Sequence, residues 1–257
     1  LKDIRKDKLI VLPNTGWDIL RLGEGWELIF KCGKSCPAHL PPHAHSDLLS
    51  FDLYYKGVPI FFEAGTSTYR NNKIRQFERS GAAHNCFQVA KFSEDQNNNL
   101  INWIESVEVW SSFRAGRKGK IIHKNSGLSE DGTIWSEASH DAFSKLNLNY
   151  KRRIEITLLR NELLKLKLIE KLDCYISINW RQNWHFGPFL NDAFINDIYY
   201  QLTLNNEFKQ KSSKTYCSYQ FGKLLERKTL YISGVCKKGL HYLSHELILN
   251  PSKLFEN

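Results

Sequence analysis

The sequence predicts an all-β fold, a large antiparallel two-sheet β-sandwich with little helix, in a single domain over residues 1–257. Apolar and polar residues alternate in short runs such as RRIEITL (152–158), LLKLKLIE (163–170) and YISINW (175–180). Alternation with a period of two is typical of strands with one buried face. Turn-forming stretches such as NSGLSEDG (125–132) and CKKG (236–239) separate the runs, and no long amphipathic helical period occurs. Many short strands with few helices predict a sandwich.

The composition restricts the partners without naming one. Lys and Arg exceed Asp and Glu by nine (36 minus 27), which favours binding to polyanions, either nucleic acid or an acidic polysaccharide. A basic surface without any partner is a third interpretation. No run of about 18 apolar residues occurs, so no membrane-spanning helix is expected. No secretory signal is visible and there is no Met, so we expect a piece of a longer protein. The six cysteines form no metal-binding pattern, and their redox state stays open.

The stretch FDLYYKGVPIFFEAG (51–65) predicts a β-hairpin. A two-residue turn at Lys56-Gly57 would pair Ser50 with Glu63. A three-residue loop that also contains Tyr55 would pair Leu49 with Glu63. We expect the three-residue loop, because Gly in its last position suits a left-handed bulge.

Two further stretches carry residues that are suited to chemistry. HAHSDLLSF (43–51) places His43, His45 and Asp47 two residues apart, so an extended segment would present all three on one face. FERSGAAHN (77–85) adds several more polar residues before another strand-like run. A single histidine most often has only a packing role, so the pattern as a whole carries the interpretation.

Three motifs in order, HAHSDLLSFDLYYKG (43–57), FFEAGTSTY (61–69) and ERSGAAHN (78–85), are similar to motifs in the heparinase II/III-like family of polysaccharide lyases. The resemblance is to the C-terminal domain of that family, and it covers most of the first 190 residues. Two positions depart from the family pattern. Glu63 stands where Asp is commoner, which keeps an oxygen ligand, and Gly81 replaces a Thr, which leaves the local turn open.

The resemblance implies a β-sandwich that packs, in complete members, against an N-terminal α/α toroid, which we expect to be absent from this chain. It implies that His43 is the catalytic histidine. It also implies that His45, Glu63 and His84 hold zinc, or another divalent metal, in a structural role. By the same resemblance, the protein is expected to be periplasmic or secreted.

The expected reaction is β-elimination on an acidic, uronic-acid-containing polysaccharide. A base removes the proton next to the sugar carboxylate, and a histidine suits this step near neutral pH. Groups that stabilise the growing negative charge are also needed, and Arg79 and Asn85 are the candidates for substrate binding. Tyr69 is the candidate acid for the leaving oxygen. Because the toroid supplies other catalytic groups in the family, we expect this chain alone to be inactive.

Several alternatives compete with this interpretation. A non-catalytic domain of the same fold would only bind glycan or serve polysaccharide assembly. A cupin-like metal enzyme also begins with His-x-His, but its acid normally follows closely, whereas Glu63 comes 18 residues after His45 (63 minus 45). A nucleic-acid binder would interleave aromatic residues with a basic stripe, which the sequence does not show. The identity of the glycan, the mode of cleavage and the role of residues 190–257 stay open.

Overall fold

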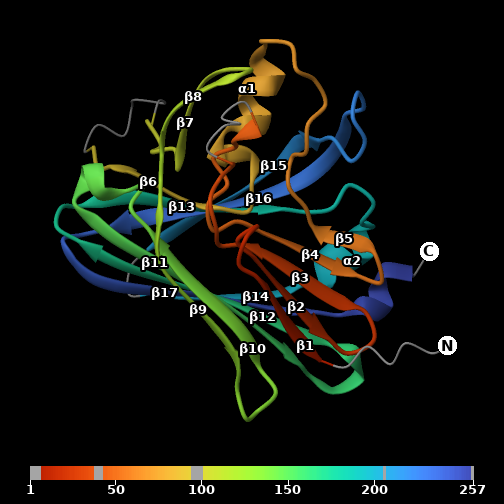
Figure 1. The fold of residues 1–257 in the computed structure, drawn as a ribbon. Helices are drawn as coiled ribbons and strands as arrows, with labels where there is room; N and C mark the ends of the chain where they lie inside the picture. The colour runs from red at the N-terminus through yellow and green to blue at the C-terminus, as the bar shows by residue number, and fades with distance from the viewer. Residues whose placement is uncertain (1–6, 38–42, 94–100, 205–206, 256–257) are drawn as a thin grey trace.

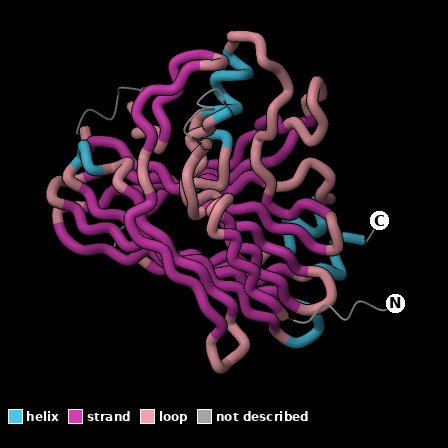
Figure 2. Tube along the Cα trace, in the orientation of Figure 1, coloured by secondary structure: helices cyan, strands magenta, loops and turns pink. Residues whose placement is uncertain are grey.

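The computed structural model describes residues 7–37, 43–93, 101–204 and 207–255. Antiparallel strands dominate this part of the chain (Figure 1), and helix is confined to short pieces (Figure 2). The predicted all-β fold is confirmed. The helices are α1 (Lys73–Arg79) and α2 (Asp192–Asp197), with short 3₁₀ turns elsewhere. None of the described helices is long and apolar enough to cross a membrane.

The described residues form four sheets. The first runs in the order β1-β2-β3-β4-β5, with β1 (Lys8–Leu12), β2 (Trp17–Leu22), β3 (Trp26–Lys31), β4 (Phe51–Tyr55) and β5 (Val58–Phe61). The second runs β14-β17-β12-β11-β10-β9, with β9 (Ile121–Leu128), β10 (Ile134–His140), β11 (Leu148–Leu158), β12 (Leu164–Cys174), β14 (Tyr199–Thr203) and β17 (Gly239–Leu249). The third runs β15-β16-β13-β6, with β6 (Phe87–Lys91), β13 (Ile178–His185), β15 (Phe208–Cys217) and β16 (Leu225–Cys236). A separate hairpin pairs β7 (Val107–Ser111) with β8 (Arg114–Lys118).

The first and third sheets join into one layer. Phe61 at the end of β5 bridges to Phe186, directly after β13, and the Phe62 N–H donates to the His185 carbonyl at 3.0 Å. The six-stranded sheet forms the opposite layer, because β2 packs on β10 and β11, and the rings of Trp180 and Trp184 contact His245 of β17. The apolar residues of the alternating runs point into the space between these layers and form its core.

The predicted three-residue hairpin loop is wrong. Tyr55 pairs with Val58, so the turn has two residues, and Lys56 and Gly57 have φ angles of 49° and 83°. Two left-handed residues give the turn a twist that matches the strands. The register then shifts between Leu53 and Tyr54, which indicates a bulge. This shift could not be deduced from the turn residues, and it changes where Glu63 lies relative to β4.

The buried Arg152 side chain connects four other segments of the chain through ion-pair and hydrogen-bond contacts. Arg152 on β11 is 0% exposed and pairs with Glu170 of β12 at 2.8 Å. Its guanidinium also donates to the Leu49 carbonyl at 2.7 Å, the Asn85 carbonyl at 3.0 Å and the Gln182 side chain at 2.5 Å. A buried charge is tolerated when it is paired and its donors are used, and this set meets both conditions. The network thus connects the core to the loops that carry the motifs.

Two buried histidines predict that acid destabilises the fold. Burial lowers the pKa of His140 to about 4, and burial together with Arg152 lowers the pKa of His245 to about 3. A histidine in the unfolded chain has a pKa of about 6.5. Between that pH and the lower pKa of the folded state, the unfolded chain binds protons that the folded chain does not. As the pH is lowered, the free energy of unfolding should therefore decrease by up to about 1.4 kcal/mol per pH unit for each histidine.

Denaturant unfolding from pH 7 down to pH 4 measures this effect. His245→Gln should flatten the decline by about one histidine's share, because it removes one of the two buried imidazoles. Equal slopes in the His245 variant and the wild type would contradict the assignment.

Candidate functional site

The segment 43–48 presents alternate residues to one side, as predicted, although it is a loop and not a strand. His43 is exposed and His45 and Asp47 are partly buried, whereas Ala44, Ser46 and Leu48 between them are buried. The segment ends at Leu49, whose φ of 59° is left-handed, a conformation that costs a residue with a side chain about 1 kcal/mol or more. Its N–H donates to the Lys31 carbonyl at 2.9 Å, and its carbonyl accepts from Arg152, so the bend is held from both sides.

Helix α1 holds the histidine segment from the other direction. Asn72 caps the helix by accepting a hydrogen bond from the Arg75 N–H at 2.9 Å. At its last residue, Arg79 Nε donates to the Ala44 carbonyl at 3.0 Å, and the Arg79 carbonyl accepts from the Ser46 N–H at 2.8 Å. The guanidinium of Arg79 also donates to the Ser111 carbonyl of β7.

Arg79 and Asn85 therefore occupy bracing positions. Both side chains are 0% exposed. Asn85 donates to the Phe51 carbonyl at 3.0 Å and accepts from the His185 N–H at 2.7 Å, which fixes the end of the 77–85 motif between β4 and β13. Their assignment as substrate-binding residues stays a prediction, and their buried contacts favour the bracing role.

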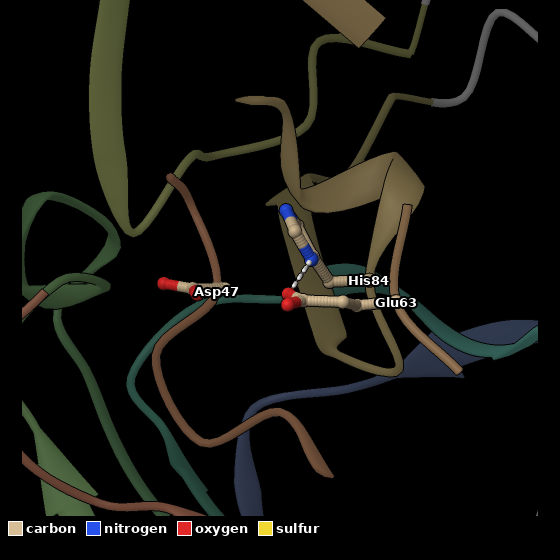
Figure 3. Close-up of side chains that lie close together, drawn as sticks. All are labelled: Asp47, Glu63 and His84. Carbon is tan, nitrogen blue, oxygen red and sulfur yellow. Dashed lines mark ion pairs between the residues drawn. The ribbon is translucent and has the colours of Figure 1, made fainter. Parts of the chain in front are cut away.

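His84 and Glu63 meet at the centre of the site (Figure 3). His84 is fully buried, and its Nδ1 lies 3.3 Å from Glu63 Oε2, although the geometry is not that of a hydrogen bond. Neither ring nitrogen has a hydrogen-bond partner among the described residues. Asp47 reaches the same place, and one ligand atom from each of Asp47, Glu63 and His84 lies within 4.8 Å of the others. The structure thus brings together two of the three predicted metal ligands and adds Asp47.

Lys31, at the end of β3, lies between the two carboxylates. Its Nζ is 2.5 Å from Glu63 Oε2 and 3.3 Å from Asp47 Oδ2. Burial alone would lower the pKa of Lys31, but the Glu63 and Asp47 carboxylates raise it well above the usual value. Burial likewise would raise the pKa of Glu63, but Lys31 and His84 hold it well below its usual range. The two groups therefore form an ion pair, with Lys31 charged and Glu63 ionised.

A third carboxyl group, Asp52 of β4, lies behind this pair. Its Oδ1 accepts from the Glu63 N–H at 3.0 Å. Burial, and next the charge of Glu63, raise the pKa of Asp52 to about 7. Two neighbouring buried carboxyl groups resist being ionised together, and here Glu63 keeps the charge.

His45 lies beside this cluster but contacts a different group. Its ring centroid is 5.4 Å from that of His84, and its Nε2 is 3.3 Å from Arg75 Nη1 of α1. Burial, and after it the neighbouring His84, Arg75 and Lys31, lower the pKa of His45 to about 2. His45 is therefore neutral at ordinary pH, which is the form of histidine that binds a metal.

The donor set fits a divalent metal. Two imidazoles and two carboxylates are ligand types that zinc takes. The nitrogens of His84, which have no hydrogen-bond partner among the described residues, are buried polar atoms that call for one. A metal at this place would share Glu63 with Lys31. The role of His45 as a ligand stays a prediction.

His43 opens onto a surface cavity of about 230 Å³. The wall combines the charged cluster with an aromatic ring and includes Trp17, Lys31, His45, Asp47 and Glu63. His43 is exposed there, so a ligand in the cavity can reach its imidazole. Trp17 is 42% exposed and offers a flat apolar surface in the same wall.

Tyr69, the predicted acid, is not among the residues that line this cavity. Its ring lies between the rings of Phe113 and Phe221, and the Arg75 guanidinium lies 5.3 Å from its centroid. Tyr69 is thus connected to His45 through Arg75, and its assignment as the acid stays a prediction.

Lys31 and Arg75 are the site residues that sequence reasoning missed. Lys31 ends the alternating run WELIFK (26–31), where it resembles any solvent-facing strand residue. Arg75 precedes the predicted ERSGAAHN motif and lies in a helix that the sequence did not predict. Asp47 was noted for its face but not as a ligand. In each case the signal lies in contacts across the sheets, which no local spacing reveals.

Comparisons with known proteins identify the family and the fold. The family profile described as heparinase II/III-like, C-terminal, matches residues 5–229. Among solved structures, a heparinase III is similar with a TM-score of 0.66 at 15% identity, covering 95% of this chain and 37% of that chain. The heparan sulfate lyase HepC from Pedobacter heparinus is similar with a TM-score of 0.63 at 16% identity, covering 94% of this chain and 36% of that chain.

A comparison with curated proteins by sequence finds no match. At such low identities the structural likeness shows the shared fold, and the chain spans little more than a third of the length of those enzymes. The family profile, which extends over most of the chain, shows more: this protein belongs to the heparinase II/III-like family, of which it carries the C-terminal domain.

Proposed function

We propose that the chain is the sandwich part of a polysaccharide lyase that cleaves a uronic-acid-containing polysaccharide by β-elimination, with His43 as the base. The observation that carries the proposal is the exposed imidazole of His43 on a charged cavity. It is supported by the family match and by the activity of a structural relative, the heparan sulfate lyase. By the same reasoning we propose that the protein acts outside the cytoplasm, where such polymers occur.

In this reaction His43 removes the proton on the sugar carbon next to the carboxylate. The electron pair of the broken C–H bond forms a double bond to the neighbouring carbon, and the bond from that carbon to the bridging oxygen breaks. The leaving oxygen then takes up a proton from a general acid, for which Tyr69 is the candidate. Lys34, which also lines the cavity, is placed to attract the substrate carboxylate, because Lys31 is already paired with Glu63 and Asp47.

A metal would support this site without taking part in the proton transfer. His45, Glu63 and His84 would hold it, with Asp47 as a further oxygen donor. A divalent ion bound there supplies a fixed positive charge that ties the 43–48 segment to β5 and to the loop before β6. The residues of the chain itself would orient His43, since His45 and Asp47, which follow it on the same face of the segment, would be fixed by the metal.

The test of the function is an assay for unsaturated uronate. The intact protein is incubated with heparan sulfate, alginate and polygalacturonate, and the ultraviolet absorbance of the new double bond is followed. Absorbance that rises with one of these polymers, and not with neutral dextran, supports the lyase. The alternative, a domain that only binds glycan, is favoured by the buried positions of Arg79 and Asn85, and it predicts binding with no absorbance change.

His84→Ala should lower both the zinc content and the thermal stability of the protein. His84 is buried and its nitrogens have no other hydrogen-bond partner in the described part of the chain, so its removal takes away a ligand. The metal content is measured by elemental analysis after dialysis against zinc, with His241→Ala on β17 as the control.

Because an alanine at a buried site loosens packing by itself, the decisive comparison is chelation. A chelator should lower the Tm of the wild type and leave the Tm of His84→Ala unchanged. Equal zinc content in the wild type and in His84→Ala would contradict the metal assignment.

A further inference from the structure

Three aromatic rings from separate parts of the chain meet on the surface near α1. Tyr69 follows β5, Phe113 forms the turn between β7 and β8, and Phe221 lies between β15 and β16. The ring centroids of Tyr69 and Phe113 are 5.6 Å apart with the planes tilted by 28°. Those of Tyr69 and Phe221 are 5.4 Å apart with a tilt of 36°. We call these three residues the aromatic platform, and Figure 1 shows α1 and the β7–β8 hairpin, which surround it, at one end of the molecule.

The platform remains open to solvent after its rings have packed on one another. Tyr69 is 42%, Phe113 51% and Phe221 61% exposed. A cluster of exposed rings is apolar surface that a folded protein seldom leaves without a use. The rings contribute to no core, since none of them belongs to the buried cluster between the two layers.

The backbone beneath the platform is held in place. The Gly222 N–H donates to the Ser67 carbonyl at 3.1 Å, which ties the Phe221 loop to the Tyr69 segment. The Ser67 N–H donates to the Glu78 carboxylate of α1 at 2.7 Å, and the Ser218 N–H donates to the Ala64 carbonyl at 2.6 Å. A surface that is ordered in advance loses little entropy when a ligand binds.

The charge around the platform selects the ligand. The three stretches that carry it, residues 66–76, 112–120 and 218–224, contain eight basic residues and no acidic one. Five of the eight are exposed, namely Arg70, Lys73, Arg114, Lys120 and Lys223. Arg117 and Lys118 are partly buried, and Arg75 is buried beside Glu78. Exposed rings with exposed cations on the same stretches of chain match an acidic sugar polymer, whose C–H faces stack on aromatic surfaces and whose carboxylate or sulfate groups pair with Lys and Arg.

Arg75 connects the platform to the catalytic cavity. Its guanidinium lies 5.3 Å from the centre of the Tyr69 ring, and its Nη1 lies 3.3 Å from His45 Nε2. His45 lines the cavity onto which His43 opens. The platform is thus separated from a residue of the cavity wall by one buried side chain.

We propose that the aromatic platform is a binding site for an acidic polysaccharide, next to the cavity in which the bond is cleaved. The inference rests on the proposed function for the class of polymer, and it adds the residues that hold the chain outside the cavity. It also gives Tyr69 a role that depends on its ring and not on its hydroxyl.

Binding of heparan sulfate to the full chain, measured by titration calorimetry, tests this proposal. Tyr69→Ala, Phe113→Ala and Phe221→Ala should each raise the Kd roughly fivefold to tenfold, because each removes one ring of the platform. Tyr69→Phe keeps the ring and should keep the affinity. Tyr242→Ala is the matched control, because Tyr242 is 56% exposed on β17 and also has a lysine, Lys171, at 5.7 Å from its ring. It should bind like the wild type.

The salt dependence separates the two parts of the interaction. Exposed charges are screened as salt rises, whereas ring contacts are not, so the difference between Tyr69→Ala and the wild type should persist in high salt. Arg70→Gln should instead reduce the slope of affinity against salt concentration.

Two results would overturn the proposal. One is unchanged affinity in all three alanine variants with an unchanged Tm, which would mean that another copy or another part of a longer protein covers the rings. The other is loss of affinity in Tyr242→Ala equal to the loss in Tyr69→Ala. The binding experiment does not depend on catalysis. If the platform variants bind more weakly but the protein forms no unsaturated product, the platform proposal holds and the lyase proposal fails.

Discussion

Arg152→Met is expected to lower the free energy of unfolding by about 3–5 kcal/mol, the largest stability effect that we predict for a single side chain. Arg152 is fully buried, and its removal leaves the Glu170 carboxylate without its cation at a position that is also 0% exposed. It also leaves the Leu49 and Asn85 carbonyls without their donor. Chemical denaturation followed by tryptophan fluorescence gives the free energy, and Arg160→Met, at an exposed position between β11 and β12, is the control.

A matched double variant separates charge from packing. Arg152→Met with Glu170→Met removes both charges and keeps apolar volume, so it should be more stable than Arg152→Met alone. Recovery stays incomplete, because the Tyr150 hydroxyl, which donates to Glu170 at 2.7 Å, then has no acceptor. A loss below about 1 kcal/mol in Arg152→Met would show that the network contributes little.

His43→Ala in the intact protein is expected to reduce turnover by about 10²–10⁴-fold, the contribution that a positioned general base typically makes. The zinc content and the Tm should not change, because His43 is exposed and lies outside the group formed by Asp47, Glu63 and His84. The measurement is the initial rate of absorbance increase at saturating polysaccharide, with His123→Ala on β9 as the control.

His45→Ala provides the contrast. It should lose zinc and stability, so that its turnover falls through the loss of the ordered site and not through the loss of the base. Should His43→Ala and His45→Ala lose equal amounts of zinc, the division of roles between these two histidines would be wrong. Full turnover in His43→Ala would remove His43 from the mechanism.

The strand pattern was predictable because each side chain on a strand reports its own burial. The runs at 152–158 and 163–170 alternate in the structure as they do in the sequence, and each lies in a long strand of the six-stranded sheet. The same logic predicted that His43, His45 and Asp47 share a face, and burial alternates along the loop that carries them. The burial of a single residue can therefore be predicted from the spacing of apolar and polar residues around it.

Which residues contact each other across strands and loops could not be predicted in the same way. The hairpin register depended on a bulge after a two-residue turn, and no residue in YYKGV signals it. Lys31 joins the site because β3 lies beside β4 and the bend at Leu49, a relation between residues far apart in the chain. Arg79 was recognised as part of a motif, but only its contacts show that the motif maintains the loop geometry.

The bridge from Phe61 to Phe186 affects how the protein avoids self-association. Without that junction, β5 would end a sheet with free backbone groups, and such an edge is a template for another chain. With β5 joined in this way, the strands at the ends of the two sheet orders are β1, β15 and β6, and the first two carry lysines. β15 carries Lys209, Lys211 and Lys214 at every second or third residue, and β1 begins with Lys8. A neighbouring copy that added a strand to either edge would bring lysines close to lysines, so the charge of these two strands opposes edge-to-edge aggregation.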